Sequence, residues 1–536
     1  MSRIASPIVL ATLNAKYIHA SLGLRCLLAN MDLHGGVGLR AQTMLREFVI
    51  QQKPTQVVEE MLALEPKVIG LGVYIWNVVE TTQVVRLLKA LRPDIKIVLG
   101  GPEVSFEVEQ QEICRLADHV VTGWGDVSFP KLCRALLDGP KPLMKVIVGE
   151  QPPLAQLALP YREYTAQDLA KRLLYVEASR GCPFKCEFCL SSLDKTAWAF
   201  ELELFMAEVG TLFRRGARNF KFVDRTFNLK IENSVRILQF FLDRIAENSD
   251  VFVHFEVVPD SLPDRLKALI AQFPAGALQF EVGIQSFNPE VQQRVSRKQD
   301  NAKTADNLRW LVSESRAHVH ADLIFGLPGE TLASFADGFD RLYALRPHEI
   351  QFGILKRLRG TPITRHTAGF AMVYDPQTPY TILQNSTVNF ATLQRVNRFA
   401  RYWDMVANSG RFSGVLTLLL RPASAFNHFM NFSDWLWQTT GKTHEFAYEK
   451  LVDLLHDYLI GQRPLVATAV RSALLADYLA SGARGKPDCL AELLLQSRSA
   501  VTVGAINRQA ERQERHLKQI SQQAHRDQIQ KAAAAA

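Results

Sequence analysis

The sequence predicts an α/β protein in which two successive regions of alternating strands and helices precede a mostly helical one. Three observations support this fold class. Apolar strand-like segments alternate with helical stretches over residues 8–148, the alternation restarts near residue 173, and the strand pattern fades after Arg357. A length of 536 residues with 47% apolar content is enough for about three domains with buried cores.

The first region has the pattern of a doubly wound parallel sheet. Its predicted strands lie at 8–13, 38–43, 68–73, 95–99, 119–122 and 144–148, and its predicted helices at 21–31, 56–64, 81–91 and 128–137. The apolar start of the chain lacks a basic segment and a cleavage-like site, so we interpret it as the first strand rather than as a signal peptide. Residues 1–150 form this predicted domain, and the proline-rich residues 151–168 form a linker.

The second region contains six β/α units, which is two short of the eight that close a full barrel. Its predicted strands lie at 173–178, 219–223, 251–257, 277–283, 319–325 and 349–355, and its predicted helices at 201–215, 232–247, 264–271, 302–315 and 332–345. We therefore expect a partial (β/α)6 barrel over residues 169–357. In parallel barrels the chemistry takes place at the carboxyl ends of the strands.

The third region, residues 358–505, is predicted to be a helical domain. Aromatic residues are concentrated at 426–437, and we interpret them as core rather than as a binding platform. Residues 506–536 are polar and helix-prone, and we expect them to form a solvated terminal tail.

Composition limits the class of protein. The formal charge of +8 is modest for this length, so nucleic acid is not an expected partner. No apolar run approaches the length of a membrane span, and seven unevenly spaced cysteines do not make a disulfide framework. We expect a cytoplasmic protein with free thiols, in which four isolated cysteines are small buried residues: Cys26, Cys114, Cys133 and Cys489.

The other three cysteines are the most informative feature of the chain. Cys182, Cys186 and Cys189 are spaced C-x3-C-x2-C just after the first predicted barrel strand. Three thiolates satisfy three irons of a [4Fe–4S] cluster and leave the fourth iron open to an exogenous ligand. A zinc site is the alternative, but zinc commonly takes four ligands in paired groups, and no second pair is present.

This cysteine spacing, preceded by Arg180 and Gly181, resembles that of the radical S-adenosylmethionine (radical SAM) enzymes. Segments 222–228, 280–286 and 322–330, at the ends of later strands, also resemble motifs of that family, in the same order. The resemblance implies that the open iron holds S-adenosylmethionine and that its cleavage gives a 5′-deoxyadenosyl radical. It also implies these residues as S-adenosylmethionine contacts: Phe188, Asp224, Glu281, Gln285 and Gly326.

The loops that follow the strands of the first domain add a second resemblance. Many radical SAM enzymes carry a cobalamin-binding domain ahead of the barrel, and segments 72–77, 100–105 and 123–126 are similar to its ligand-binding loops. Glycines there let the backbone approach a corrin or its nucleotide tail. The resemblance implies these cobalamin-binding residues: Tyr74, Trp76, Asn77, Gly100, Gly101, Gly123 and Gly125.

One motif of the cobalamin-binding domains is absent. Many carry a D-x-H-x-x-G loop after the first strand, but residues 14–19 here read Asn-Ala-Lys-Tyr-Ile-His. His19 and His34 are therefore poor candidates for a cobalt ligand. We expect Tyr74 or Trp76 to cover the lower face of the cobalamin without a ligand from the protein.

The combined resemblance implies an enzyme that uses a [4Fe–4S] cluster, S-adenosylmethionine and cobalamin to methylate an unactivated carbon or phosphorus. The expected partners are a small-molecule or peptide substrate and a one-electron donor such as a flavodoxin or ferredoxin. Cyclisation or rearrangement without methyl transfer is an alternative reaction. An RNA methylthiotransferase is disfavoured because the chain lacks a clustered N-terminal cysteine set and a β-rich C-terminus. A non-catalytic cobalamin sensor would have no use for the cysteine triplet.

Overall fold

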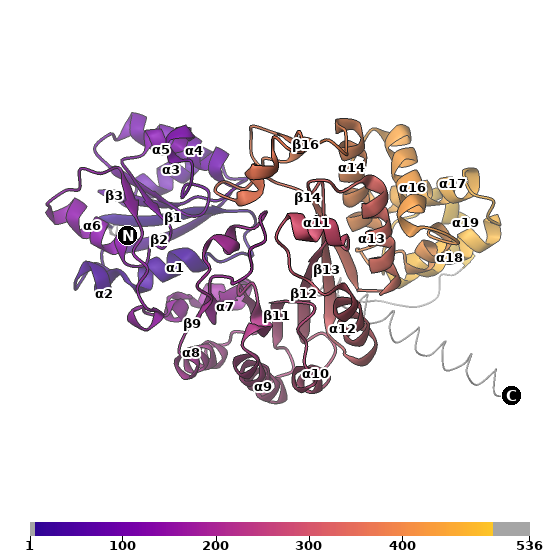
Figure 1. Cartoon of the computed structure of the whole chain (residues 1–536), viewed down its shortest axis with the longest axis horizontal. Coiled ribbons are helices and arrows are strands. Elements are labelled where there is room, and N and C mark those ends of the chain that lie inside the picture. The colour runs from indigo at the N-terminus through magenta and orange to yellow at the C-terminus, as the bar shows by residue number, and fades with distance from the viewer. Residues whose placement is uncertain (1–5, 497–536) are drawn as a thin grey trace. The chain divides into compact units, whose positions relative to one another are not determined.

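A computed structural model describes residues 6–496 (Figure 1). The chain forms two compact units. The first unit contains the described residues up to 256, together with 356–365 and 374–381. The second unit contains residues 257–355 and 366–373 and the described residues from 382 onward.

The first unit begins with a parallel sheet of six strands in the order β2-β1-β3-β4-β5-β6. These are β1 (Ile8–Asn14), β2 (Thr43–Val49), β3 (Val68–Gly72), β4 (Lys96–Gly100), β5 (His119–Thr122) and β6 (Val146–Val148). The chain leaves β1 toward β2 and then continues on the other side through β3, so the strand order reverses between β1 and β3. Open α/β sheets bind ligands at the carboxyl edge near such a reversal. The doubly wound sheet predicted from the sequence is confirmed.

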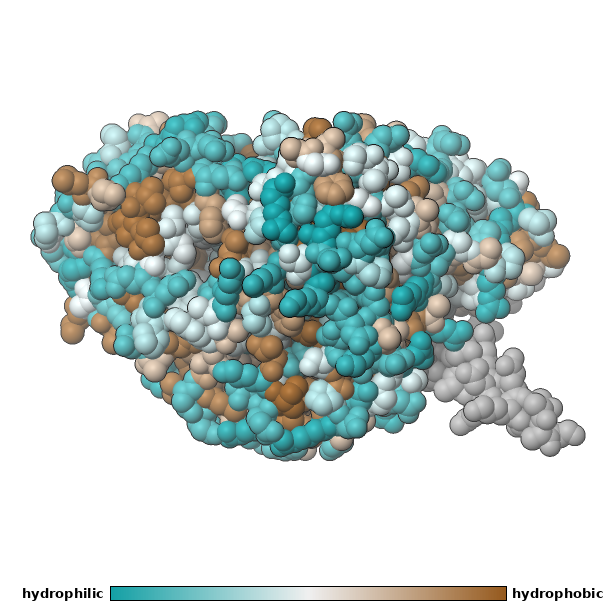
Figure 2. Space-filling model, in the orientation of Figure 1, coloured by the Kyte–Doolittle hydropathy of each residue, from teal (hydrophilic) through white to brown (hydrophobic). Residues whose placement is uncertain are grey.

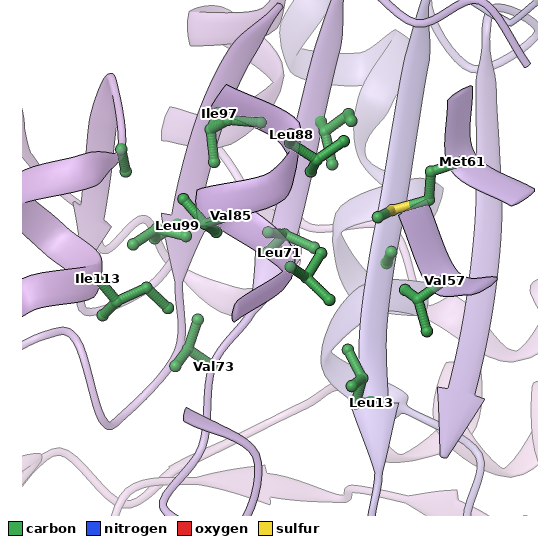
Figure 3. Close-up of a cluster of buried hydrophobic side chains, with 14 of the residues drawn as sticks. Leu13, Val57, Met61, Leu71, Val73, Val85, Leu88, Ile97, Leu99 and Ile113 are labelled. Atoms are coloured by element: carbon green, nitrogen blue, oxygen red, sulfur yellow. The ribbon is translucent and has the colours of Figure 1, made fainter. Parts of the chain in front are cut away.

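Helices cover both faces of this sheet because successive strand residues point to opposite sides. Figure 3 shows one core, in which Leu13, Leu71 and Ile97 from the strands meet helical side chains such as Met61 and Leu88. This face is covered by α3 (Pro54–Leu62), α4 (Val78–Leu91) and α5 (Glu112–Leu116). The opposite face is covered by α1 (Leu22–Ala29), α2 (Met31–Gly35) and α6 (Ser128–Asp138).

The second strand lies elsewhere than predicted. We expected it at 38–43, but residues 37–42 form a turn in which Gly38 has a positive φ, and β2 runs over Thr43–Val49. The strand contains a charged residue, Glu47, that is almost fully buried and pairs with Arg25 at 2.8 Å and Arg172 at 2.7 Å. Because β2 carries this buried charge, it lacks the apolar pattern by which a strand is predicted. Its partners are distant in the sequence, so no local pattern indicates the pairing.

The proline-rich segment after the first sheet belongs to the first unit and is partly buried in it. Leu154, Leu157, Tyr161 and Tyr164 are buried, and the hydroxyl of Tyr161 donates to the backbone oxygen of Glu177 at 2.9 Å. A short helix, α7 (Ala166–Lys171), follows and begins with a capping box.

Six further parallel strands follow in chain order: β7 (Leu174–Val176), β10 (Asn219–Phe222), β11 (Phe252–Val257), β12 (Leu278–Gln285), β13 (His318–Phe325) and β14 (Glu349–Ile354). In the first unit β10 pairs with both β7 and β11, and in the second unit β13 pairs with both β12 and β14. The intervening helices are α8 (Leu202–Arg214), α9 (Ile231–Glu247), α10 (Asp264–Ile270), α11 (Pro289–Arg294), α12 (Asn301–Glu314) and α13 (Leu332–Ala344). The predicted (β/α)6 class is confirmed.

The second unit ends in helices whose aromatic residues form a core. These helices are α14 (Phe390–Val406), α15 (Ser413–Leu419), α16 (Ala425–Thr440), α17 (Tyr448–Gly461), α18 (Ala467–Ala480) and α19 (Ala491–Gln496). They follow two short strands, β15 (Val373–Tyr374) and β16 (Ile382–Gln384). The ring of Phe399 lies 4.9 Å from those of Phe426 and Phe429, and all three side chains are buried. The expected aromatic core is confirmed, whereas the predicted tail at 506–536 lies outside the described residues.

On the face shown in Figure 2, hydrophilic residues predominate, and a hydrophobic patch lies over the first unit. Among the described residues, no helix combines the length and the apolar character that crossing a membrane requires.

Candidate active site

A cavity of about 280 Å³ opens between the first sheet and the helices α1 and α6. Strand residues form its floor, and three of them, Gly70, Gly72 and Gly100, carry no side chain to fill it. A Cβ atom on Gly100 would have only the backbone oxygen of Val121 near it, at 3.7 Å. Apolar side chains line most of the rest, which suits a flat, largely apolar ligand group.

Five of the seven predicted cobalamin-binding residues line this cavity: Tyr74, Gly100, Gly101, Gly123 and Gly125. Trp76 is not in the lining, but its ring stacks on that of Tyr74 with centroids 4.4 Å apart.

Asn77 is also outside the lining, and it is fully buried. Its side chain accepts a hydrogen bond from the backbone nitrogen of Tyr74 and donates to the backbone oxygens of Leu13 and Gly72. Asn77 therefore fixes the loop that carries Tyr74 rather than facing the cavity.

The two histidines considered as cobalt ligands have other partners. The Nδ1 atom of His19 lies 2.7 Å from the hydroxyl of Tyr175, and burial lowers the pKa of His19. The Nε2 atom of His34 lies 3.1 Å from the backbone oxygen of Gln156. Of the described residues that line the cavity, none is a histidine.

The polar edge of the cavity is a buried cluster around Arg180. Its guanidinium lies 2.8 Å from Asp126 and 2.7 Å from Glu177, and it also contacts the sulfur of Cys26 at 3.5 Å. Burial opposes the charge on Arg180, but the two carboxylates raise its pKa well above the ordinary value. Burial and the nearby Glu177 raise the pKa of Cys26, so this thiol is neutral. The sequence analysis did not predict this cluster. The available signal was the presence of two acidic residues, Asp126 and Glu177, near the ends of predicted strands.

The cysteine triplet lies between two short antiparallel strands, β8 (Ser179–Arg180) and β9 (Trp198–Ala199). The backbone nitrogen of Cys182 donates to the backbone oxygen of Asp194 at 2.8 Å. The Ser192 hydroxyl donates to the backbone oxygens of Cys186 at 2.9 Å and Cys189 at 2.7 Å. These bonds fix the backbone on both sides of the thiols.

The three cysteines lie in one short segment, Cys182 to Cys189. Burial is the main cause of the raised pKa of Cys182, and the thiols of Cys189 and Cys186 contribute to it. Within residues 6–496, no three His, Cys, Asp or Glu side chains come together closely enough to hold a single metal ion. The donor set of three cysteine thiols in one short segment is that of a [4Fe–4S] cluster, in which each thiolate binds a different iron.

Two of the predicted S-adenosylmethionine contacts lie in the first unit. Asp224 is buried and accepts hydrogen bonds from the backbone nitrogen of Ala178 at 2.9 Å and the hydroxyl of Ser179 at 2.5 Å. Burial raises the pKa of Asp224 to about 7. Asp224 thus anchors the chain just before the cysteine triplet, within which Phe188 is half-buried.

The other three predicted contacts lie in the second unit. Glu281 lies opposite His320 of β13, and a bulge between Gly283 and Gln285 shifts the register of β12 before Gln285. The backbone of Gln285 has a φ of 70°, and its side-chain amide folds back over Gly283. Gly326 follows β13 with a φ of 93°, and a Cβ there would lie 2.9 Å from the side chain of Ile382.

Comparison with known families gives the class of protein. Residues 8–133 match the B12 binding domain, and residues 176–342 match the radical SAM superfamily. Residues 368–536 match a family described as a protein of unknown function, DUF4080. The chain thus combines a region that matches the B12 binding domain with a following region that matches the radical SAM superfamily. These two domains imply a [4Fe–4S] cluster, S-adenosylmethionine and cobalamin as cofactors, as the sequence predicted.

Individual relatives support the same class. An uncharacterized methyltransferase of Pyrococcus horikoshii is 26% identical over 50% of this chain and 62% of its own length. The cobalamin-dependent radical SAM methyltransferase TokK of Streptomyces tokunonensis is 26% identical over 54% of this chain and 47% of its own length. The chain thus spans between about half and three fifths of the length of these two relatives.

A solved structure shares the fold. The cobalamin-dependent S-adenosylmethionine radical enzyme OxsB with aqua-cobalamin bound aligns over 92% of this chain and 83% of its own, with a TM-score of 0.61 and 13% identity.

Proposed function

We propose that the protein is a cobalamin-dependent radical SAM methyltransferase that methylates an unactivated carbon or phosphorus of a small molecule or peptide. The observation that carries this proposal is the cavity at the first sheet, whose polar edge is formed by Arg180, two residues before Cys182. Arg180 thus belongs both to the lining of the proposed cobalamin cavity and to the segment that leads into the proposed cluster ligands. Two relatives that are named as methyltransferases favour methyl transfer over cyclisation or rearrangement.

We assign the residues as follows. Cys182, Cys186 and Cys189 hold the cluster, and the glycine-lined cavity holds the cobalamin. From the resemblance we take these residues as S-adenosylmethionine contacts: Phe188, Asp224, Glu281, Gln285 and Gly326. When bound, the cofactors supply one-electron cleavage of S-adenosylmethionine and a carrier for its methyl group. Asp224 orients the cluster-binding segment through Ala178 and Ser179.

The domain assignment follows from the same proposal. Residues 1–150 bind cobalamin, 151–168 connect, 169–357 carry the radical chemistry and 358–505 contribute to substrate choice. An external one-electron donor such as a flavodoxin or ferredoxin reduces the cluster. The enzyme acts in the cytoplasm, where free thiols persist.

We further propose that no protein side chain ligates the cobalt. Both histidines first considered bond elsewhere, and Tyr74, backed by Trp76, lines the cavity. The absorption and electron paramagnetic resonance spectra of the bound cobalamin test this point. Nitrogen hyperfine coupling to a histidine would refute it.

The central test is anaerobic reconstitution followed by incubation with methyl-labelled S-adenosylmethionine and a reductant. We expect release of 5′-deoxyadenosine and appearance of the label on the bound cobalamin. Cys182→Ala should abolish the release of 5′-deoxyadenosine. Release of 5′-deoxyadenosine with no label on cobalamin would instead support the cyclisation or rearrangement alternative.

A further inference from the structure

Arg180 belongs both to the cavity and to the cluster-binding segment. It lines the cavity, and it precedes Cys182 by two residues. Asp126, from the loop after β5, and Glu177, from the end of β7, hold its guanidinium. The Arg180, Asp126 and Glu177 side chains are 14%, 7% and 10% exposed, so this connection is shielded from solvent.

Trp124 provides a second connection between the two sites. Its ring lines the cavity, and its Nε1 donates to a carboxylate oxygen of Asp194 at 3.1 Å. The backbone oxygen of the same Asp194 accepts the hydrogen bond from the Cys182 nitrogen at 2.8 Å. The guanidinium of Arg180 also lies over the Trp124 ring, 5.0 Å from its centroid, so the two connections touch each other.

A ligand in the cavity contacts Trp124 and Arg180 directly and therefore stabilises the positions in which they fit it. Because these residues also hold the backbone at 180–182, the same positions favour one arrangement of the first cysteine. Buried, hydrogen-bonded contacts of this kind adopt discrete arrangements and can transmit a binding free energy. Coupling between two binding sites is reciprocal by thermodynamic necessity.

We propose that cobalamin binding in the cavity and cluster assembly on Cys182, Cys186 and Cys189 are energetically coupled, with Trp124 and Arg180 as positioning residues. This inference rests on the cofactor assignments of the proposed function but not on methyl transfer. Cobalamin binding then favours the cluster-ready arrangement of the cysteine segment, and cluster assembly strengthens the retention of cobalamin.

The test measures the affinity of the full chain for hydroxocobalamin by equilibrium dialysis, before and after anaerobic assembly of the cluster. In the wild type we expect the cluster to tighten binding by about fivefold or more, the lower end of typical coupling. Trp124→Phe keeps an aromatic ring in the cavity wall but loses the hydrogen-bond donor to Asp194. In this variant the ratio of hydroxocobalamin affinities with and without the cluster should therefore fall toward one. Trp198→Phe is the matched control, because Trp198 packs on Trp124 with centroids 5.7 Å apart but does not line the cavity, and its ratio should stay at the wild-type value.

The reciprocal measurement is the resistance of the cluster to an iron chelator with and without hydroxocobalamin. At equilibrium, the factor by which hydroxocobalamin strengthens cluster binding should equal the factor by which the cluster strengthens hydroxocobalamin binding in dialysis. Arg180→Lys keeps a cation between Asp126 and Glu177 and should retain part of the coupling that Arg180→Gln loses. If Arg180→Gln fails to fold, Trp124→Phe still decides the question.

Equal hydroxocobalamin affinities with and without the cluster in the wild type would overturn the coupling and leave the proposed function intact. Failure of the wild type to bind hydroxocobalamin at all would overturn the proposed function as well.

Discussion

A Cβ atom placed on Gly101 would lie 2.4 Å from the backbone oxygen of Val73. Gly101 has a φ of 112°, a conformation that residues with a Cβ rarely adopt, and the two strand ends are further joined by a hydrogen bond from Val73 to the Gly100 oxygen at 2.8 Å. The sequence indicated that this glycine lets the backbone approach a ligand. In the structure the closest approach that it permits is between β3 and β4 of the protein itself.

Gly101→Ala should therefore destabilise the protein, whereas Gly100→Ala should not. The first substitution combines a strained φ with a clash against backbone, for an expected cost of about 3 kcal/mol or more. In the second substitution, the atom nearest to the new Cβ is the backbone oxygen of Val121, at an ordinary contact distance of 3.7 Å. Chemical denaturation of both variants measures the difference, and equal midpoints would contradict this account of the two strand ends.

Larger side chains at Gly100 should reduce cobalamin binding without unfolding the protein. Leucine there would extend into space that the structure leaves open, so the affinity for hydroxocobalamin should fall by about tenfold or more, which corresponds to about 1.4 kcal/mol. Gly100→Ala should have a smaller effect than Gly100→Leu. Gly369→Leu is the control, because a Cβ on Gly369 would have no atom within 4 Å and this residue lies in the second unit. Undiminished binding by Gly100→Leu would mean that cobalamin does not use this cavity.

Alanine at any of the three clustered cysteines should remove most of the iron after anaerobic reconstitution, because each thiolate is expected to hold a different iron. Cys489→Ala is the control, since Cys489 lies in the helical region and its backbone nitrogen bonds to Asp453 at 3.0 Å. Iron and sulfide contents of the purified variants measure the effect. Full iron content in Cys186→Ala would exclude the proposed ligand set.

The positions of the glycine loops follow from sequence because parallel strands bring their carboxyl ends to one edge of a sheet. Gly100 and Gly123 were found in this way. The direction of a loop side chain does not follow in the same way. Asn77 lies in a predicted binding loop, yet its amide is engaged by the backbone of β1 and β3.

Buried charges explain most of what the sequence did not predict. Arg180 and Asp126 are 54 positions apart, so their contact depends on how two domains pack rather than on any local pattern. The second strand was misplaced for the same reason, since the charge of Glu47 is balanced by Arg172, 125 positions away. Periodicity detects apolar faces and gives no signal for such pairs.

Glu330, after β13, makes stability depend on pH. It is 1% exposed, its Oε1 accepts the Ser286 hydroxyl at 2.5 Å, and its Oε2 has no hydrogen-bond partner within the described part of the chain. Burial raises its pKa to about 7. In the unfolded chain the carboxyl ionises near its ordinary value of about 4.3. Between about pH 4.3 and 7 the folded state therefore holds a proton that the unfolded state releases. The free energy of unfolding falls as the pH rises through this range.

Glu330→Gln should remove this pH dependence, because the amide stays neutral and still accepts the Ser286 hydrogen bond. The variant should match the wild type near pH 4.5 and become more stable above pH 7, by up to about 3 kcal/mol for a shift of this size. Denaturation midpoints at several pH values measure the difference. The control is Glu60→Gln, an exposed carboxylate on α3, which should leave the profile unchanged. A Glu330→Gln profile parallel to that of the wild type would show that Glu330 is ionised in the folded protein throughout the range.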